Sequence, residues 1–297
     1  MSKQQIKQII EKRVNKNGLV ETGVKGVHLF RVTEGIPCVP VVYEPTMVAI
    51  VNGTKEAILD GKTYVFDSSQ YMCCTVSMPV EAGASTASPD NPLLGVFISL
   101  DTRVMTELAI EMESATGVIR QPRGGPLPQG FALAHWDETF TGALLRLLEL
   151  GDSPTDTAVL GDGRLREVYY AILKGDAGNA ARRAFGVGNE IARVIAYLSS
   201  HLDEAITIED MAAQVGMSRA VLHRKFKQAT TMSPIQFVKS MRLNSAAMKI
   251  AGGMTVNEAA IEVGYVSTSQ FSREFKRMYG QSPRQWSHSK QLPMRMA

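Results

Sequence analysis

A segment of roughly thirty residues occurs twice near the C-terminal end of this 297-residue chain, and this repeat constrains the fold most strongly. Three pairs of stretches match in the same order: 210–216 (DMAAQVG) with 258–264 (EAAIEVG), 218–227 (SRAVLHRKFK) with 267–276 (STSQFSREFK), and 233–237 (SPIQF) with 282–286 (SPRQW). The second copy carries one extra residue, Val266, between its first two stretches. Two copies of one pattern predict two copies of one supersecondary unit.

Each copy predicts two short helices joined by a tight turn. In the first copy a helix over 208–215 begins after Thr207, a good N-cap residue, and ends at Gly216, which suits a left-handed conformation. Met217 and Ser218 form the turn, and Ser218 is placed to cap the next helix. A helix, a glycine-containing turn and a second helix together predict a helix-turn-helix unit.

The second helix of each copy has one apolar face and one polar, basic face. The apolar side chains recur at helical spacing and are expected in the core: Leu222, Phe226 and Ala229, then Phe271, Phe275 and Met278. The outer faces carry Ala220, His223, Arg224 and Lys227, then Ser269, Ser272, Arg273 and Lys276. A helix with such an outer face fits the major groove of DNA. The alternative is a helical hairpin for protein contact, and the duplication of the outer face favours DNA.

A long helix is predicted between the two copies. Pro234 suits the first turn of a helix that runs to Ala251 and ends at Gly252 and Gly253. About eighteen residues at a rise of about 1.5 Å give a length of roughly 27 Å. This length is comparable to one DNA turn of about 34 Å, so both units are expected to enter successive major grooves on one face of the duplex.

Residues 188–288 resemble the DNA-binding domain of the AraC/XylS family of bacterial transcription regulators. The most specific signature is 261–286 (IEVGYVSTSQFSREFKRMYGQSPRQW). The resemblance implies one all-α domain of seven helices, with two recognition helices joined by a long helix. It also implies that the protein regulates the initiation of transcription.

The resemblance assigns roles on the two recognition helices. The base-contacting positions of the family fall at Ala220, His223, Arg224, Ser269, Ser272 and Arg273. Arg224 and Arg273 are suited to donate to guanine O6 and N7, whereas Ala220 offers at most contact with a thymine methyl group. Phosphate contacts, which position the domain without selecting sequence, are expected from Ser218, Arg219, Lys227, Ser267, Thr268 and Lys276. For the two lysines, a purely solvated role remains open.

The N-terminal part has the pattern of a small β-barrel or jelly roll. Apolar stretches over 27–33, 47–51, 70–76 and 94–100 are separated by turn residues. The pairs Asn52–Gly53 and Asp60–Gly61 predict hairpins. Helical periodicity returns after Asp101, and the composition of 121–130 predicts a loop.

This part also resembles the cupin-like N-terminal domain of one AraC subgroup, through stretches at 52–56, 60–64, 87–94 and 100–101. The two resemblances imply an α+β multidomain fold, a cupin-like β-barrel with flanking helices followed by the all-α domain. We divide the chain into an N-terminal amphipathic helix or arm (1–17), a sensing or dimerisation domain with a helical extension (18–185) and a double helix-turn-helix domain (186–297). The expected partners are double-stranded promoter or operator DNA, a second copy of the chain, RNA polymerase and a small-molecule effector of unknown identity.

Two alternatives remain beside a regulator controlled through its N-terminal domain. One is a constitutive DNA-binding regulator without a ligand. The other is a cupin-type enzyme with a docking helical domain, which needs several converging metal ligands. The N-terminal part offers only His28 and His135, in separate elements, so we expect no metal site, no cofactor and no catalytic residue.

Several further side chains leave their roles open. Strand alternation points one thiol of Cys73 and Cys74 into the barrel and the other out, and both are expected as buried small apolar groups. Tyr43, Tyr64, Tyr71 and Arg31 either line a cavity or belong to core and rim. A leucine stripe over 135–150 is either a dimer interface or a face that packs on the β-domain.

Charge and composition are consistent with a chain of two kinds of domain. Residues 186–297 contain 14 Lys and Arg against 8 Asp and Glu, a net charge of +6, whereas the whole chain has a net charge of +3. The asymmetry suggests that the C-terminal part meets a polyanion. The sequence has no run of eighteen apolar residues and no apolar signal-peptide core, so we expect a cytoplasmic protein without a membrane span.

Overall fold

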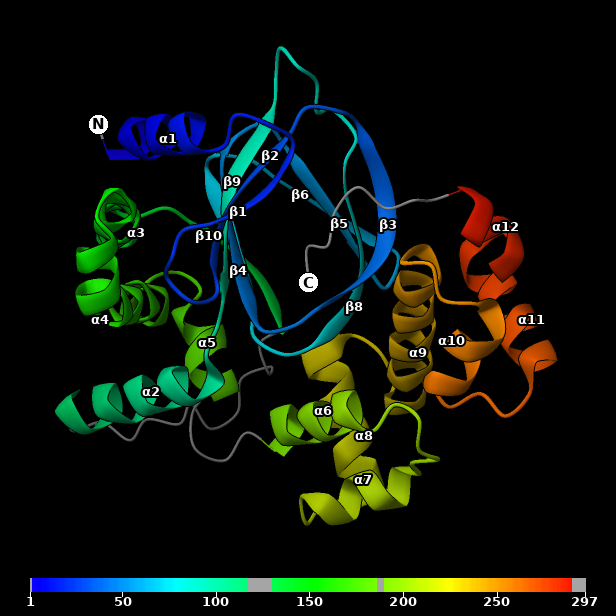
Figure 1. Ribbon diagram of the computed structural model, residues 1–297. Coiled ribbons are helices and arrows are strands. Elements are labelled where there is room, and N and C mark those ends of the chain that lie inside the picture. Colours follow the sequence, from blue (N-terminus) through cyan, green and yellow to red (C-terminus); the bar gives the residue numbers. More distant parts are fainter. Residues whose placement is uncertain (1, 117–129, 186–189, 290–297) are drawn as a thin grey trace.

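The computed structural model describes residues 2–116, 130–185 and 190–289 (Figure 1). Its N-terminal part is a β-barrel of two antiparallel sheets. The larger sheet has the order β1 (Gly18–Glu21), β2 (Val27–Val32), β9 (Leu93–Ser99), β4 (Thr46–Asn52), β7 (Gln70–Cys74) and β10 (Phe131–His135). The smaller sheet has the order β3 (Ile36–Tyr43), β8 (Met78–Ala84), β5 (Lys55–Leu59) and β6 (Lys62–Phe66). The predicted strands are confirmed to within two residues at each end.

Alternation along the strands of the larger sheet divides its side chains between two cores. The side chains of Phe30, Val48 and Met72 lie on the inner face of the larger sheet, which points toward the smaller sheet. On the outer face Leu29, Met47 and Val96 pack beneath helices. Every strand between β2 and β7 in this sheet is therefore buried on both sides, which explains its long apolar runs.

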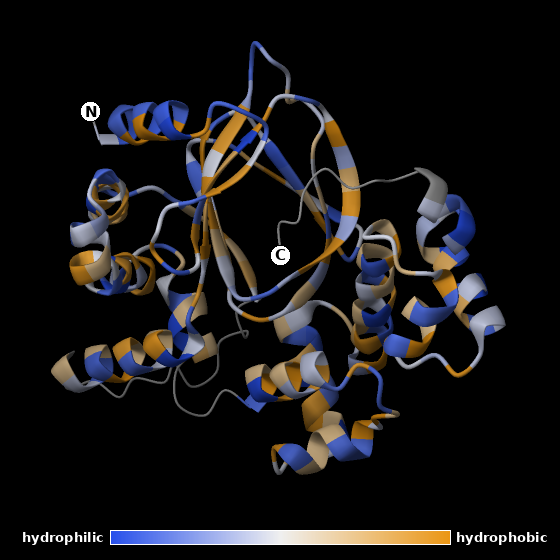
Figure 2. Cartoon of the chain, viewed as in Figure 1, coloured by the Kyte–Doolittle hydropathy of each residue, from blue (hydrophilic) through white to orange (hydrophobic). Residues whose placement is uncertain are grey.

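Five helices cover the outer face of the larger sheet and form one layer beside the barrel (Figure 1). They are α1 (Ser2–Arg13), α2 (Thr102–Thr116), α3 (Glu138–Glu149), α4 (Pro154–Lys174) and α5 (Gly178–Phe185), with a 3₁₀ turn at Leu150–Asp152 between α3 and α4. Helix α1 is mostly hydrophilic in Figure 2, and it buries Ile6 and Ile10 against this core. The arm is thus an integral part of the N-terminal core.

The leucine stripe lies in α3, where it packs inside the protein. Phe140, Leu144, Leu147 and Leu148 are buried in the core under the larger sheet. Tyr71 of β7 stacks on Phe140 with ring centroids 4.2 Å apart. The stripe is therefore occupied within one chain, and the alternative of a dimer interface on this face is wrong.

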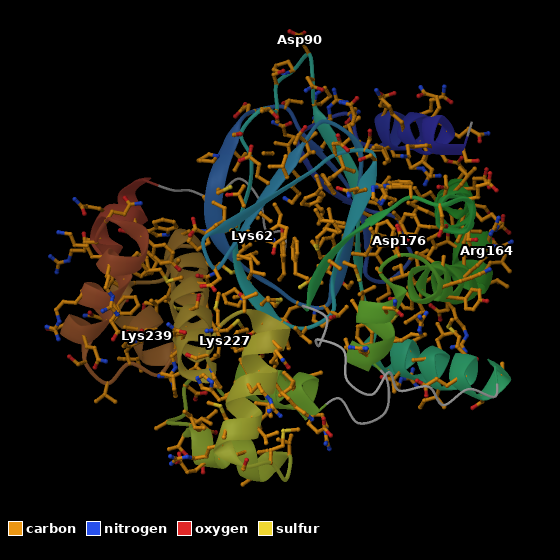
Figure 3. All side chains as sticks on the ribbon, turned by 180° about the vertical axis from the view of Figure 1, so that it is seen from behind. Lys62, Asp90, Arg164, Asp176, Lys227 and Lys239 are labelled. Carbon is orange, nitrogen blue, oxygen red and sulfur yellow. The ribbon has the colours of Figure 1, made fainter. Side chains whose placement is uncertain are left out.

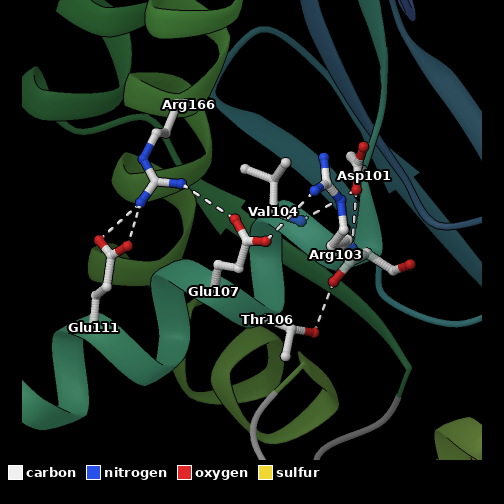
Figure 4. A network of polar contacts seen from close by, with 8 residues as sticks. Asp101, Arg103, Val104, Thr106, Glu107, Glu111 and Arg166 are labelled. Atoms are coloured by element: carbon white, nitrogen blue, oxygen red, sulfur yellow. Dashed lines mark hydrogen bonds and ion pairs between the residues drawn. The ribbon is translucent and has the colours of Figure 1, made fainter.

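An exposed polar network ties α2 to α4 (Figure 4). The Arg166 guanidinium of α4 lies 2.7 Å from each carboxylate oxygen of Glu111 and 4.0 Å from Glu107 of α2. At the start of α2, the Asp101 carboxylate accepts hydrogen bonds from the backbone N–H groups of Arg103 and Val104. Exposed pairs of this kind contribute little stability each, so the network mainly fixes the direction of α2.

The two predicted hairpins have different outcomes. Asp60–Gly61 joins β5 to β6, and both residues have the positive φ angles, 50° and 75°, of a tight hairpin turn. Asn52–Gly53 joins β4 to β5, which lie in different sheets, so the hairpin predicted there is wrong. Gly53 is still required, because a Cβ at its φ of 80° would lie 2.9 Å from Leu93 Cα. Of the predicted loop, 121–129 lies outside the described residues.

The cysteines and tyrosines follow strand alternation. Cys73 belongs to the outer core and Cys74 to the barrel interior, and both are fully buried as expected. Burial raises the pKa of Cys73 to about 12. Tyr43 faces the interior, whereas Tyr71 faces the outer core, so the suggested tyrosine group does not lie in one place.

The C-terminal part contributes seven helices among the described residues. They are α6 (Glu190–Ser200), α7 (Ile208–Gln214), α8 (Arg219–Thr230), α9 (Pro234–Ala251), α10 (Val256–Glu262), α11 (Thr268–Tyr279) and α12 (Pro283–Ser289). Helix α9 runs along β3 and β8 of the barrel, with α6 to α8 at one end and α10 to α12 at the other (Figure 1). None of the helices within the described ranges has the length and apolarity that crossing a membrane requires.

Candidate nucleic-acid interface

The first helix-turn-helix unit consists of α7 and α8. Thr207 and Asp210 cap α7 reciprocally: the Asp210 N–H donates to Thr207 Oγ1 at 3.1 Å, and the Thr207 N–H donates to Asp210 Oδ2 at 2.9 Å. Ser218 caps α8 by accepting from the Val221 N–H at 3.4 Å. These side chains fix where each helix begins, as the sequence predicts.

The second unit, α10 and α11, repeats the same devices. Thr255 and Glu258 form a capping box at α10, with distances of 3.1 Å and 3.3 Å between the paired atoms. Ser267 caps α11 by accepting from the Gln270 N–H at 3.2 Å. The duplication in sequence is therefore a duplication of local structure.

Both turns depend on a glycine with positive φ. Gly216 has a φ of 62° and open space where a Cβ would stand. Gly264 has a φ of 82°, and a Cβ there would lie 2.7 Å from the Asp203 carbonyl oxygen and 2.8 Å from that of Leu202. The second turn thus needs glycine for its conformation and also for the close approach of the loop after α6.

The inner faces of α8 and α11, the recognition helices, are buried as predicted except at their last turns. Leu222, Phe226, Phe271 and Phe275 are fully buried. Met278 is 37% exposed, so its predicted place in the core is wrong. The ring of Tyr279 occupies the equivalent space, with its centroid 4.6 Å from that of Phe275 and 5.3 Å from that of Trp286.

The predicted base-contacting residues gather into two separate faces, one on each recognition helix. Ala220, His223 and Arg224 are all exposed on α8. On α11, Ser269 and Arg273 are exposed and Ser272 is half-buried. Within the described part of the chain, none of these six side chains forms a hydrogen bond or ion pair with another residue. Each face is therefore free to meet a ligand.

The predicted phosphate-contacting residues differ in their surroundings. Lys227, Thr268 and Lys276 are exposed (Lys227 is labelled in Figure 3). Ser218 and Ser267 use an oxygen lone pair as helix caps, which leaves each hydroxyl proton able to donate to a phosphate. Arg219 forms an exposed ion pair with Glu209, and DNA would have to replace that contact.

Polar contacts that sequence reasoning missed fix α11 relative to α9. The Glu274 carboxylate accepts from Lys239 Nζ at 3.1 Å and from the Tyr265 hydroxyl at 2.8 Å (Lys239 is labelled in Figure 3). Partial burial disfavours the charged carboxylate, but the hydrogen bonds from Tyr265 and Lys239 outweigh it and lower the pKa of Glu274. Trp286 adds a bond from its indole N–H to the Ala247 carbonyl at 3.1 Å.

Helix α9 also joins the interface to the barrel. The buried Asn244 amide donates to the carbonyls of Val41 at 2.9 Å and Val80 at 3.1 Å, on β3 and β8. Its oxygen accepts from the hydroxyl of Tyr279, the last residue of recognition helix α11. The sequence signal for this contact is an asparagine in the middle of an apolar helix face, because a buried amide needs hydrogen-bond partners outside the helix.

A second contact joins the barrel to the first recognition helix. The Gly130 N–H, at the start of β10, donates to the carbonyl of Ala229 in α8 at 2.8 Å. A Cβ at Gly130 would lie 2.4 Å from Val76 Cγ2 and 3.2 Å from Met78 Sδ, two side chains of the barrel interior. Helix α8 thus bonds to the barrel part directly, and α11 is linked to it through Asn244 of α9.

The two N-terminal histidines lie in different surroundings. His28 is on the inner face of β2, and His135 is on β10 with Nδ1 3.4 Å from an Asp176 carboxylate oxygen. Across the described residues, no group of three or more His, Cys, Asp or Glu side chains is arranged to hold a metal ion.

Comparisons with known proteins match both parts of the chain. The family model for the N-terminus of AraC-type transcriptional regulators matches residues 23–180, and a helix-turn-helix domain model matches 211–289. The transcriptional activator RhaS of Escherichia fergusonii is 30% identical over 116 residues, which are 39% of each chain. The regulatory protein SoxS of Escherichia coli is 29% identical over 99 residues, 33% of this chain and 92% of SoxS.

The match to RhaS thus spans well under half the length of that relative. Among solved structures, a ligand-bound form of ToxT from Vibrio cholerae superposes with a TM-score of 0.57, covering 88% of this chain and 97% of ToxT at 14% identity. At this identity the likeness shows the fold alone, a two-domain arrangement of β-barrel and double helix-turn-helix. With a family model that covers more than half of its length, the chain belongs to the AraC/XylS family of transcription regulators.

Proposed function

We propose that this regulator binds promoter DNA with α8 and α11 in two successive major grooves. The observation that carries the proposal is the duplicated exposed face, with His223 and Arg224 on one helix and Ser269 and Arg273 on the other. The 18-residue helix α9, about 27 Å long at about 1.5 Å per residue, connects the two units. The ion pair between Lys239 and Glu274 and the bond from Tyr279 to Asn244 hold α11 against α9.

The roles of the side chains follow from their chemistry. Arg224, Arg273 and His223 donate to base edges, Arg most effectively to guanine O6 and N7, and Ser269 and Ser272 contact either kind of base pair. Ala220 adds only contact with a thymine methyl group, so the first recognition helix selects sequence through fewer positions than the second. Lys227, Lys276, Thr268 and the two capping serines hold phosphates, together with Arg219 once it leaves Glu209.

The N-terminal domain controls how α8 and α11 are presented. The support is physical continuity: β3 and β8 bond to Asn244 of α9, and Gly130 bonds to Ala229 of α8. A small-molecule effector or a change of dimer state that shifts these strands would move the two recognition helices relative to one another. Only a ligand that binds the two arrangements with different affinity would shift their populations.

The remaining partners belong to the same proposal. A homodimer is supported by apolar side chains left exposed on α4, where Val159 is 74% and Leu160 44% exposed. We propose RNA polymerase as a further partner because the family regulates transcription, and we propose a cytoplasmic location for the same reason. The relatives are regulators, so we propose no enzymatic activity; stoichiometric metal in the purified protein would contradict this.

The direct test is selection of bound sequences from a randomised DNA pool by the full chain at fixed salt. The proposal predicts enrichment of a site with two conserved blocks, and loss of at least one block in the Arg224→Ala, Arg273→Ala double variant. A double variant that enriches the same site as the parent would contradict the assignment of base contacts. Enrichment of nothing above the starting pool would contradict sequence-specific binding altogether.

A further inference from the structure

The turns of the two helix-turn-helix units differ in length by one residue, and the structure shows which residue is extra. In the first turn the Met217 N–H donates to the Ala212 carbonyl at 3.0 Å. In the second turn the Tyr265 N–H donates to the Ala260 carbonyl at 2.9 Å. Tyr265 is therefore the structural equivalent of Met217. Val266, which follows Tyr265, is the inserted residue.

Val266 does not pack as an apolar residue directly before a helix cap usually does. Such a residue commonly packs on the fourth residue of the helix, which is Phe271 in α11. Tyr265 takes that place instead, with its ring centroid 5.2 Å from that of Phe271. The relative exposure of Val266 is 105%, the highest among the large apolar residues in the described ranges. Its two methyl groups are therefore available to a partner.

The backbone on both sides of Val266 is anchored. On one side, the Tyr265 hydroxyl donates to the Glu274 carboxylate of α11 at 2.8 Å. On the other side, Ser267 caps α11 by accepting from the Gln270 N–H at 3.2 Å. A β-branched side chain on such a backbone has few rotamers, so it loses little conformational entropy when a partner covers it.

The surface around Val266 indicates what this partner is. The four residues that follow it, 267–270, are all exposed and form the cap and first turn of recognition helix α11. They include Thr268 and Ser269, which we propose as phosphate and base contacts. When a recognition helix binds in the major groove, its N-terminal residues contact the base edges. The apolar group that ordinary base pairs present in this groove is the C5 methyl group of thymine.

We propose that Val266 contacts the C5 methyl group of a pyrimidine at the edge of the DNA block that α11 binds, so that the second unit selects thymine there. This contact rests on the proposed function, because it requires α11 to lie in a major groove. The first unit has no equivalent contact, since its shorter turn has no residue between Met217 and Ser218. Because 5-methylcytosine presents the same methyl group, the contact also makes binding sensitive to methylation of cytosine at C5.

The experiment measures the affinity of the full chain for its selected site while single methyl groups are removed or added. Each thymine is replaced in turn by uracil, and each cytosine by 5-methylcytosine, which changes the methyl group and leaves the base pairing intact. The block that α11 binds is the one that Arg273→Ala weakens. We expect at least one position in this block at which the methylated base raises affinity about fourfold, the effect of burying one methyl group.

Val266→Ala should abolish most of this methyl effect, whereas Val266→Ile should keep it. Both variants should melt at the parental temperature, because the side chain is fully exposed in the free protein. Ile261→Ala is the matched control, since Ile261 is 65% exposed in the same unit but belongs to α10, which precedes the recognition helix. This control should keep the methyl effect.

Two results would overturn the inference and leave the proposed function intact. In the first, the parent shows no methyl effect in the block that Arg273→Ala weakens. In the second, Val266→Ala keeps the parental methyl effect at every position, including the case of an equal loss of affinity for DNA with thymine and with uracil, which would mean contact with the sugar-phosphate backbone. If the full chain selects no DNA site, the proposed function and this contact fail together.

Discussion

At the scale of single residues, the two arginines and the two lysines of the recognition helices have separable tasks. Arg273→Ala should cost about 1–3 kcal/mol of binding free energy and relax the preference at one base pair. Lys276→Ala should weaken all sequences alike and reduce the slope of log affinity against log salt concentration by about 1. The measurement is a titration of matched and mismatched DNA at several salt concentrations.

Equal losses on every sequence for both variants would contradict these roles. Lys227→Ala is the matched control on the other helix, because it occupies the position equivalent to Lys276 in the repeat. It should reproduce the salt effect of Lys276→Ala and leave the base preferences of α11 unchanged.

The two turn glycines give a second residue-scale prediction. Gly216→Ala should lower the free energy of unfolding by about 1 kcal/mol, the cost of a left-handed conformation with a Cβ. Gly264→Ala should lower it by about 3 kcal/mol, because its Cβ also collides with the carbonyls of Leu202 and Asp203. Denaturant unfolding of the full chain measures both free energies. Equal effects would contradict the prediction, because they would mean that the loop after α6 moves away from the added Cβ with no loss of stability.

At the scale of elements, the sequence predicts those features that are set by residues close together in the chain. Helix caps such as Thr207 and Ser218, the turn glycines and the alternation of Cys73 and Cys74 are local, and the structure confirms them. The pair Asn52–Gly53 misleads because a hairpin signal does not reveal that β4 and β5 belong to different sheets. Met278 misleads because Tyr279, one residue later, fills the core instead.

Contacts between distant elements were not predictable in this way. Asn244 bonds to strands that lie 203 and 164 residues away in the chain, and the periodicity of α9 indicates only that one side of the helix is apolar. The individual DNA-contacting roles on α8 and α11 remain predictions.

Asn244 carries the prediction at this scale. Asn244→Ala removes the two bonds to the carbonyls of Val41 and Val80 and the partner of the Tyr279 hydroxyl in a buried contact, which should lower the free energy of unfolding by about 3 kcal/mol. Tyr279→Phe is the matched control and should cost about 1 kcal/mol, because it removes one bond and keeps the ring.

The two variants should also differ in regulation. If α9 transmits the state of the barrel, Asn244→Ala should reduce the change in DNA affinity that an effector produces. The bonds from Asn244 to the barrel survive in Tyr279→Phe, so this control should keep most of the response. An undiminished response in Asn244→Ala would show that coupling runs through another contact, of which Gly130 to Ala229 is the candidate.

At the scale of the whole molecule, the barrel and the DNA-binding domain share α9. One face of this helix packs on β3 and β8. The Phe237 ring of α9 contacts Phe226 of α8, and Lys239 and Asn244 bond to side chains of α11. A rigid spacer between two recognition faces gives affinity for sites of one spacing, because only then do both faces bind at once. The proposed function therefore depends most on the geometry of the bound DNA.

Footprinting of the full chain on its selected site, at single-nucleotide resolution, tests this geometry most directly. We expect two protected major-groove segments on one face of the duplex, with centres about 10–10.5 base pairs apart. Insertion of about half a turn between them should abolish protection of one segment, and a full turn should not restore it, because α9 has a fixed length. Protection of a single groove, or full protection after either insertion, would contradict the account.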